Sequence, residues 1–163
     1  MNIMKNVVLL IGGNLGDRLS LIEEAENLLG KLFVIVQRSQ IYETTAWGGE
    51  SEGDYLNRIL IIKTEMKPET VLRYTQDIED ILERTRSRKW GNRTMDIDIL
   101  YIDGEVINTP LLAVPHPLIQ ERKFALVPLA ELLPDFKHPL FGKSSRQLLD
   151  ECKDMGEVNV YRP

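Results

Sequence analysis

The sequence predicts an α+β domain in which helices cover an antiparallel sheet. Two helical segments alternate with strand-like runs, in the order strand, helix, strand, repeated once. The length of 163 residues, with 43% hydrophobic and 28% charged residues, suits one globular domain over residues 1–163. The strand-like runs are rich in β-branched and aromatic residues, and they cover residues 6–12, 33–43, 55–65 and 95–102.

The first half of the chain contains a strand, a helix and a second strand. Residues 6–12 form a continuous apolar run that Gly-Gly-Asn ends, which is typical of a buried strand and a turn. Residues 17–29 place apolar side chains on one face of a helix, and we expect that helix to end just before Gly30. Residues 33–43 predict the second strand, and residues 44–54 predict a long polar loop of the kind that is often functional.

The middle of the chain repeats the pattern. Residues 55–65 predict a third strand, and a helix begins at Pro68, a residue favoured in the first turn. The fourth strand covers residues 95–102. This order is the split βαβ arrangement, so we expect a ferredoxin-like βαββαβ domain with helices on one face of the sheet. The C-terminal third, with helices predicted near residues 122–133 and 145–152, is expected to elaborate the same domain.

Charge and cysteine content narrow the class of protein. The net charge is −5, yet residues 84–93 contain five basic residues and no acid. This distribution favours a local polyphosphate ligand over a nucleic-acid backbone, so we expect no nucleic-acid partner. The first apolar stretch is far shorter than the roughly 20 residues of a membrane span. The lone Cys152 cannot form an internal disulfide, and we expect a cytoplasmic protein without a membrane partner.

Asp96 and Asp98 give the strongest chemical signal. Residues two apart in a strand point to the same face, so both carboxylates project together, with Ile97 and Ile99 on the other face. Paired carboxylates favour a bound cation, and Mg²⁺ accepts one or two of them beside water and substrate phosphates. The alternative is a solvated sheet face, which the adjacent basic segment makes less favoured.

Other motifs exclude several kinds of chemistry. His116 and His138 lack the neighbouring ligands of a zinc site, and no Gly-x-Ser-x-Gly motif offers a nucleophile. The Gly-rich turn after the first strand lacks the Lys-Ser/Thr end of a phosphate-binding Walker loop. Trp90 suits either base stacking or anchoring of its loop, and the basic residues suit either phosphate binding or a solvated loop. Residue type and spacing therefore predict a phosphate site with metal and arginines, without naming the substrate.

Several motifs in a fixed order resemble the 6-hydroxymethyl-7,8-dihydropterin pyrophosphokinase family of folate biosynthesis. The resemblance covers about residues 7–149. Its motifs are Gly12-Gly13-Asn14-Leu15-Gly16, Tyr42-Glu43-Thr44, Asp54-Tyr55-Leu56-Asn57, Arg84-x-Arg86, the run from Lys89 to Asp98, Val114-Pro115-His116-Pro117 and Arg122-Lys123-Phe124.

This resemblance implies a ferredoxin-like fold and a substrate pair, ATP and the pterin, with AMP as a product. It implies that Asp96 and Asp98 hold two Mg²⁺ ions and that Arg84 and Arg93 contact the phosphates during the reaction. The residues implied to bind ATP are Gln76, Glu79, Arg86, Lys89, Trp90, Ile99, His116 and Arg122. The residues implied to bind the pterin are Thr44, Ala46, Trp47, Tyr55, Asn57 and Phe124, with the ring stacked between Tyr55 and Phe124. We expect a monomer.

Two other functions stay open on the residues alone. A nucleotidyltransferase also combines a Gly-rich turn with an Asp-x-Asp strand, but it would release pyrophosphate instead of AMP. A ferredoxin-like RNA-binding module would use the basic segment and the aromatic residues. Such a module would bind RNA in a salt-dependent way without needing Mg²⁺.

Overall fold

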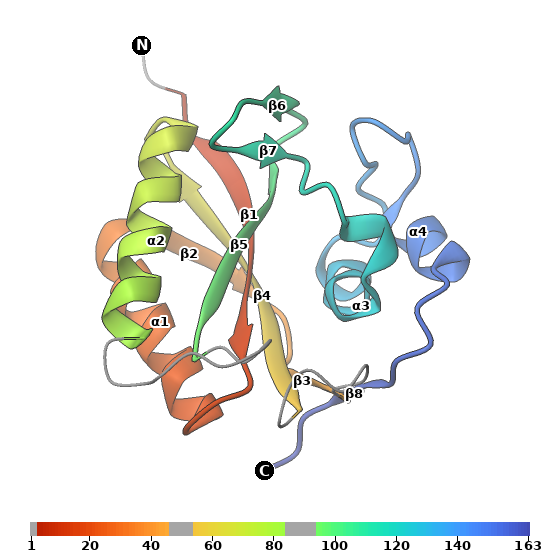
Figure 1. Cartoon of the computed structure of the whole chain (residues 1–163). Coiled ribbons are helices and arrows are strands. Elements are labelled where there is room, and N and C mark those ends of the chain that lie inside the picture. Colours follow the sequence, from red (N-terminus) through yellow and green to blue (C-terminus); the bar gives the residue numbers. More distant parts are fainter. Residues whose placement is uncertain (1–2, 46–53, 84–93) are drawn as a thin grey trace.

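The computed structural model describes residues 3–45, 54–83 and 94–163, which form an antiparallel sheet between two helical layers (Figure 1). The strand order is β5-β1-β4-β3-β8, and β2 also pairs with β4. The sheet strands are β1 (Lys5–Gly13), β2 (Val34–Arg38), β3 (Tyr42–Thr44), β4 (Tyr55–Thr64), β5 (Asp96–Ile102) and β8 (Val158–Val160). The helices are α1 (Arg18–Leu32), α2 (Pro68–Glu83), α3 (Lys123–Leu132) and α4 (Ser145–Glu151).

Strands β1 and β4 form the centre of the sheet, and both of their faces are buried. Val7, Leu9 and Ile11 pack in the core beneath α1 and α2, whereas Val8 and Leu10 pack in a second core beneath α3 and α4. A strand covered on both faces has no solvated side, and this explains the uninterrupted apolar run that predicts β1.

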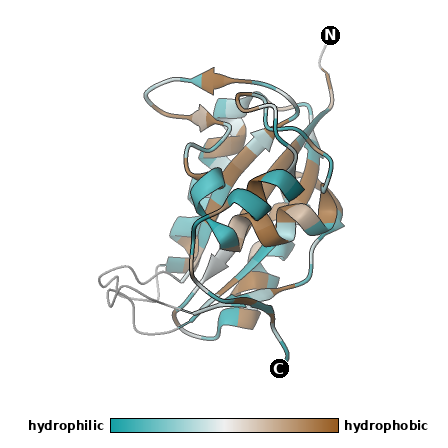
Figure 2. Ribbon diagram, turned by 90° about the vertical axis from the view of Figure 1, so that its right-hand side faces the viewer, coloured by the Kyte–Doolittle hydropathy of each residue, from teal (hydrophilic) through white to brown (hydrophobic). Residues whose placement is uncertain are grey.

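The helices of the predicted βαββαβ pattern, α1 and α2, lie on one face of the sheet, as expected, and the helices of the C-terminal third lie on the other face. Helices α1 and α2 cover one face, while α3 and α4 from the C-terminal third cover the other (Figure 1). Figure 2, viewed from the side of α3 and α4, shows predominantly apolar strands behind these helices. In the part of the chain that the structure describes, no helix is long and apolar enough to cross a membrane.

Helix α1 continues past the residue at which we expected it to end. Asp17 caps its first turn by accepting a hydrogen bond from the Ser20 N–H at 3.2 Å. Gly30 lies inside the helix, which ends at Leu32, where the Phe33 N–H donates to the Leu29 carbonyl at 2.8 Å. Burial of the apolar face of α1 outweighs the cost of about 1 kcal/mol for an internal glycine.

The single strand predicted over residues 33–43 is two strands, β2 and β3, separated at residues 39–41. Between the pairs Arg38↔Leu60 and Tyr42↔Asn57, this edge contains one residue more than β4 does. Such an extra residue bends a strand as a β-bulge does. Hydrophobic pattern alone does not locate the break, because it depends on polar contacts with distant residues.

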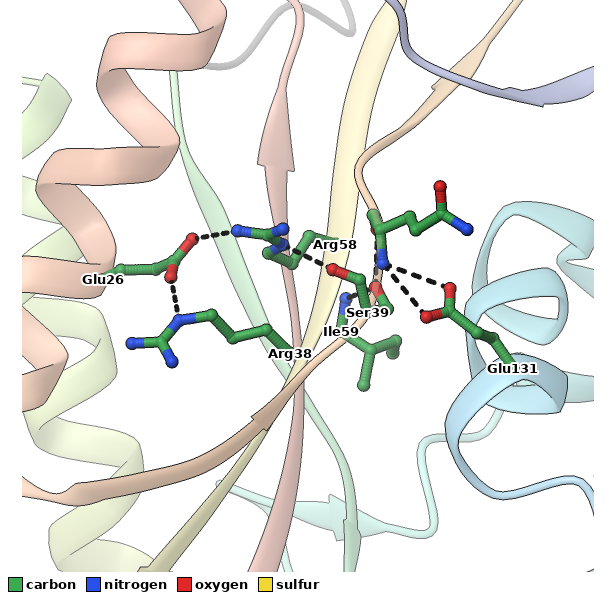
Figure 3. A network of polar contacts seen from close by, with 7 residues as sticks. Glu26, Arg38, Ser39, Arg58, Ile59 and Glu131 are labelled. Carbon is green, nitrogen blue, oxygen red and sulfur yellow. Dashed lines mark hydrogen bonds and ion pairs between the residues drawn. The ribbon is translucent and has the colours of Figure 1, made fainter.

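A polar network stabilises this bend and crosses the sheet (Figure 3). On the α1 side, Glu26 forms ion pairs with Arg38 at 2.6 Å and Arg58 at 2.9 Å. At the bend, the Ser39 hydroxyl accepts from the Ile59 N–H at 2.9 Å. On the α3 side, Glu131 accepts hydrogen bonds from the Gln40 N–H and the Tyr42 hydroxyl, the latter at 2.7 Å.

The structure also contains elements that the sequence pattern did not predict. A short hairpin joins β6 (Ile107–Asn108) to β7 (Ala113–Val114), and a 3-10 turn covers Ile119–Glu121. Strand β8 comes from the end of the chain and pairs with β3. Strands of two or three residues are too short to show an alternating pattern.

Candidate active site

Asp96 and Asp98 lie at the start of β5 with their side chains on one face, opposite Ile97 and Ile99, as predicted. Ile97 and Ile99 between and beside them are each 4% exposed and pack beneath α1 and α2, whereas both aspartates are partly exposed. The alternation places the two carboxylates on the α3 side of the sheet, together with the buried Leu100. Strand β5 is the outermost strand of the described sheet on this side, next to β1.

Glu79 joins this pair from helix α2. One of its carboxylate oxygens accepts a hydrogen bond from the Ile97 N–H at 2.8 Å. Burial, and then the negative charges of Asp96 and Asp98, raise the pKa of Glu79 to about 7. Three carboxylates therefore share one small region, and a cation would relieve their repulsion.

The donor set at this point fits Mg²⁺. Among the described residues, no group of three or more His, Cys, Asp or Glu side chains is arranged to hold a metal ion. Two carboxylates on one face still suit Mg²⁺, because this ion usually takes most of its ligands from water and substrate phosphates. A site built from Asp96 and Asp98 would therefore be completed by a phosphorylated substrate.

His116 lies near Asp98 and near Arg122. The His116 N–H donates to the Leu100 carbonyl at 3.0 Å and so fixes this residue against the outer edge of β5. Burial lowers the pKa of His116, although the charge of Asp98 acts in the opposite direction and Arg122 adds to the lowering. His116 Nδ1 accepts from the Leu118 N–H at 3.1 Å, so the neutral ring carries its proton on Nε2.

Gly12 of β1 lies between Asp96 of β5 and Asn57 of β4 in the sheet, and it makes room for the Asn57 side chain. The register pairs Gly12 with both Asp96 and Asn57. A Cβ at Gly12 would lie 2.0 Å from the Leu56 carbonyl oxygen and 2.4 Å from Asn57 Nδ2. Only glycine therefore allows the buried Asn57 amide to lie over β1. The sequence pattern indicates only a turn after Gly12; the Gly-Gly pair at the strand end is the signal that could have indicated this close approach.

Tyr55 and Asn57 point to the sheet face that α3 covers. Ile59 and Ile61 of the same strand pack in the core beneath α3, and alternation puts Tyr55 and Asn57 on their side. Phe124, in the first turn of α3, packs against that same core. The Arg122 guanidinium lies 5.6 Å from the centroid of the Phe124 ring. The predicted stacking partners thus come from the two layers that enclose this end of the sheet.

Thr44 has a polar atom available to a ligand on that face. It pairs with Tyr55 in the register of β3 and β4, so both side chains point the same way. Its Oγ1 is buried, and within the described ranges it has no hydrogen-bond partner. A buried hydroxyl without a partner is costly, so a bound polar group would stabilise it.

The remaining predicted residues divide into two sets. Gln76 is exposed on α2, three residues before Glu79, and the Ile99 side chain is buried in the core, so only its main chain is available to a ligand. The other predicted residues lie outside the described ranges; they are Ala46, Trp47, Arg84, Arg86, Lys89, Trp90 and Arg93.

Arg18, in the first turn of α1, connects the strands that carry Thr44 and Tyr55, and its sequence context gives no sign of this role. Its guanidinium donates to the Glu43 carboxylate at 2.7 Å and to the Asp54 carbonyl at 2.9 Å. These contacts tie the residue before Thr44 to the residue before Tyr55. No sequence pattern pairs Arg18 with Glu43, because the contact exists only once α1 lies against the sheet.

The chain matches a family model and several characterised relatives. The family is described as 7,8-dihydro-6-hydroxymethylpterin-pyrophosphokinase, and the match covers residues 8–134. The chain is 40% identical over 148 residues to the 2-amino-4-hydroxy-6-hydroxymethyldihydropteridine pyrophosphokinase of Aquifex aeolicus, covering 91% of this chain and 92% of the relative. It is 42% identical over 132 residues to the Bacillus subtilis protein of the same name, covering 79% of each.

A solved structure gives the same result for the fold. Plasmodium falciparum HPPK-DHPS, crystallised with pteroate, superposes with a TM-score of 0.73 at 15% identity. The alignment covers 93% of this chain and 45% of the longer Plasmodium chain. On the strength of the family model and the bacterial relatives, the chain belongs to the 7,8-dihydro-6-hydroxymethylpterin-pyrophosphokinase family.

Proposed function

We propose that this chain transfers the terminal diphosphate of ATP to the hydroxymethyl group of 6-hydroxymethyl-7,8-dihydropterin and releases AMP. The family match over residues 8–134 and the names of the bacterial relatives support this step of folate biosynthesis. In the reaction, the hydroxymethyl oxygen bonds to the β-phosphorus of ATP. The bond from that phosphorus to the oxygen bridging to the α-phosphorus breaks, and AMP leaves with that oxygen.

The pairing of Asp96 and Asp98 on one face of β5 is the observation that carries this proposal. The two aspartates would hold Mg²⁺, which neutralises charge on the triphosphate when bound. Glu79 would keep the start of β5 in place through its bond to the Ile97 N–H. The chain supplies position and charge in this reaction, and no covalent intermediate with the protein is needed.

Cationic and neutral donors beside the pair would bind the phosphates of ATP. His116 would offer its Nε2–H and Arg122 its guanidinium, and the His116 ring feels the charges of both Asp98 and Arg122. Gln76 and the main chain of Ile99 would contact the nucleotide at the open edge of β5. We assign the same substrate to residues outside the described ranges: Arg86, Lys89 and Trp90 bind ATP, and Arg84 and Arg93 act on the phosphates during transfer.

The pterin would lie between the sheet and α3. Tyr55 and Phe124 would stack on the two faces of the heterocycle, an arrangement that suits a flat ring. The Asn57 amide and the Thr44 hydroxyl would bind its polar edge; that Thr44 Oγ1 is buried without a hydrogen-bond partner among the described residues supports this role. Ala46 and Trp47 complete the proposed set.

Finer features of the same proposal concern the ions, the fold and the assembly. We propose that two Mg²⁺ ions act at Asp96 and Asp98 and that the chain is a cytoplasmic monomer. The order β5-β1-β4 with β2 and β3 beside it supports a ferredoxin-like βαββαβ core, to which α3, α4 and β8 are added.

Substitution of Asp98 tests the proposed site. Asp98→Asn keeps the size of the side chain but removes one of the two paired charges, so Mg²⁺ binds poorly and turnover falls by about a thousandfold or more. The measurement is AMP release at saturating substrates, beside thermal unfolding of the metal-free chain. Asp150→Asn, an exposed substitution on α4, is the matched control and should keep full activity. Activity of Asp98→Asn close to that of the control would contradict the metal assignment.

A further inference from the structure

The C-terminal segment, residues 154–161, contacts both layers of the proposed pterin site. It meets the first turn of α3, which carries Phe124, and then forms β8 beside β3, which carries Thr44 (Figure 1). The segment itself lies outside the residues to which we assign substrate contacts. Its contacts therefore connect helix α3 to strand β3.

Asp154 caps α3 from outside the helix. The residue that precedes the helix, Arg122, makes no side-chain capping bond. Instead, the Lys123 N–H donates to Asp154 Oδ2 at 3.2 Å, while Oδ1 of the same carboxylate accepts from the Gly156 N–H at 2.8 Å. A carboxylate at this end of a helix satisfies a free N–H and interacts favourably with the helix dipole.

A second bond ties the same turn to the segment. Lys123 Nζ donates to the Gly156 carbonyl at 3.2 Å. Within that turn, the Arg122 carbonyl accepts from the N–H groups of Ala125 and Leu126, both at 3.1 Å. The main chain of Arg122 is thus held by the turn that Asp154 caps, and the Phe124 ring is held with it.

On the sheet side, β8 fixes the strand that carries Thr44. Val158 pairs with Thr44 and Val160 pairs with Tyr42. The Thr45 N–H donates to the Glu157 carbonyl at 3.2 Å, which continues the pairing to the end of the described part of this strand. One short segment therefore sets the spacing between α3 and β3.

We propose that Asp154 is a positioning residue for pterin binding, because it links the first turn of α3 to the segment that pairs with β3. This inference rests on the proposed function, in which Phe124 stacks on the pterin and Thr44 binds its edge. Asp154 is not among the residues to which we assign substrate contacts, and it acts through the placement of Phe124.

The test measures the affinity for the pterin and the KM for ATP separately, in the chain of residues 1–163. Loss of a helix cap is equivalent to about a fivefold change in an equilibrium constant. For Asp154→Ala we therefore expect the Kd of 6-hydroxymethyl-7,8-dihydropterin to rise about fivefold, measured by titration calorimetry with Mg²⁺ and a non-hydrolysable ATP analogue. The KM for ATP should rise less, because ATP also depends on Asp96, Asp98 and His116.

Two variants serve as controls. Asp154→Asn keeps an oxygen that can accept from the Lys123 N–H, so its pterin Kd should stay within about twofold of the wild type. Asp150→Ala removes an exposed carboxylate from the nearby helix α4 and should leave both constants unchanged.

Wild-type pterin affinity in Asp154→Ala, or equal losses for pterin and ATP, would overturn the inference. If Asp154→Ala does not fold, Asp154→Ser takes its place, because its shorter side chain brings the acceptor oxygen out of reach of the Lys123 N–H; an unchanged pterin Kd in that variant would overturn the inference instead. A wild-type chain that binds no pterin would contradict the proposed function itself, so the two failures are distinguishable.

Discussion

At the scale of single residues, the absence of a side chain at Gly12 makes room for the Asn57 amide over β1. We expect Gly12→Ala to destabilise the fold by about 3 kcal/mol, because the added Cβ would overlap the Leu56 carbonyl and the Asn57 amide. Urea unfolding measures this change. Gly104→Ala is the matched control, since a Cβ at Gly104 has no neighbour within 4 Å among the described residues. Equal midpoints for the two variants would contradict the proposed packing of Asn57 over β1.

Some residues of the site follow from the sequence and others do not. Asp96 and Asp98 could be predicted because alternation in a strand fixes their common face regardless of the rest of the fold. The link from Glu79 to the Ile97 N–H could not, because it depends on where α2 lies along the edge of β5. The contacts of Arg18 and Asp154 join distant parts of the chain and have no local pattern at all.

At the scale of elements, the sequence predicts long segments with a strong hydrophobic pattern correctly. It does not predict very short strands, or strand ends that depend on polar contacts. Strand β4 and helix α2 begin at Tyr55 and Pro68, as predicted. The break between β2 and β3 was missed, because it depends on Ser39 and on Glu131 from α3. Strand β8 was missed because three residues that pair with a distant strand give no periodic signal.

The turn that follows α3 provides a pH-dependent prediction at this scale. His138 is 2% exposed, and its Nδ1 accepts hydrogen bonds from the N–H groups of Leu140 and Phe141. Burial lowers the pKa of His138 below its usual value of 6.5, so the folded state favours the neutral ring. Below pH 6.5 the unfolded chain gains a proton that the folded chain resists, and stability should fall as the pH is lowered toward the folded pKa.

Replacement of His138 separates its contribution to the pH dependence of stability from the contributions of other titrating groups. His138→Asn keeps an acceptor near the Nδ1 position but does not titrate, so its free energy of unfolding should fall less between pH 7.5 and pH 5 than that of the wild type. Urea unfolding at several pH values gives both slopes. Identical slopes would show that His138 does not contribute, even if the variant is less stable throughout.

At the scale of the whole molecule, the sheet and its two helical layers bring residues from distant segments to one region. β5 supplies Asp96 and Asp98, the segment after β7 supplies His116, and α3, β3 and β4 carry Phe124, Thr44, Tyr55 and Asn57, to which we propose that the pterin binds. Strands β1, β4 and β5 and helices α1 and α2 could be predicted from the sequence. The position of α3 over the opposite face could not, because it is set by tertiary packing of the apolar residues of that face.

The proposed transfer of a diphosphate group determines which nucleotide is released, so the reaction is best tested by identifying that product. The purified chain is incubated with ATP, Mg²⁺ and 6-hydroxymethyl-7,8-dihydropterin, and the nucleotides are separated by chromatography. Diphosphate transfer predicts that AMP forms in an amount equal to the pterin consumed and that no AMP forms when the pterin is omitted. ADP as the product, or release of pyrophosphate with AMP attached to the acceptor, would contradict it.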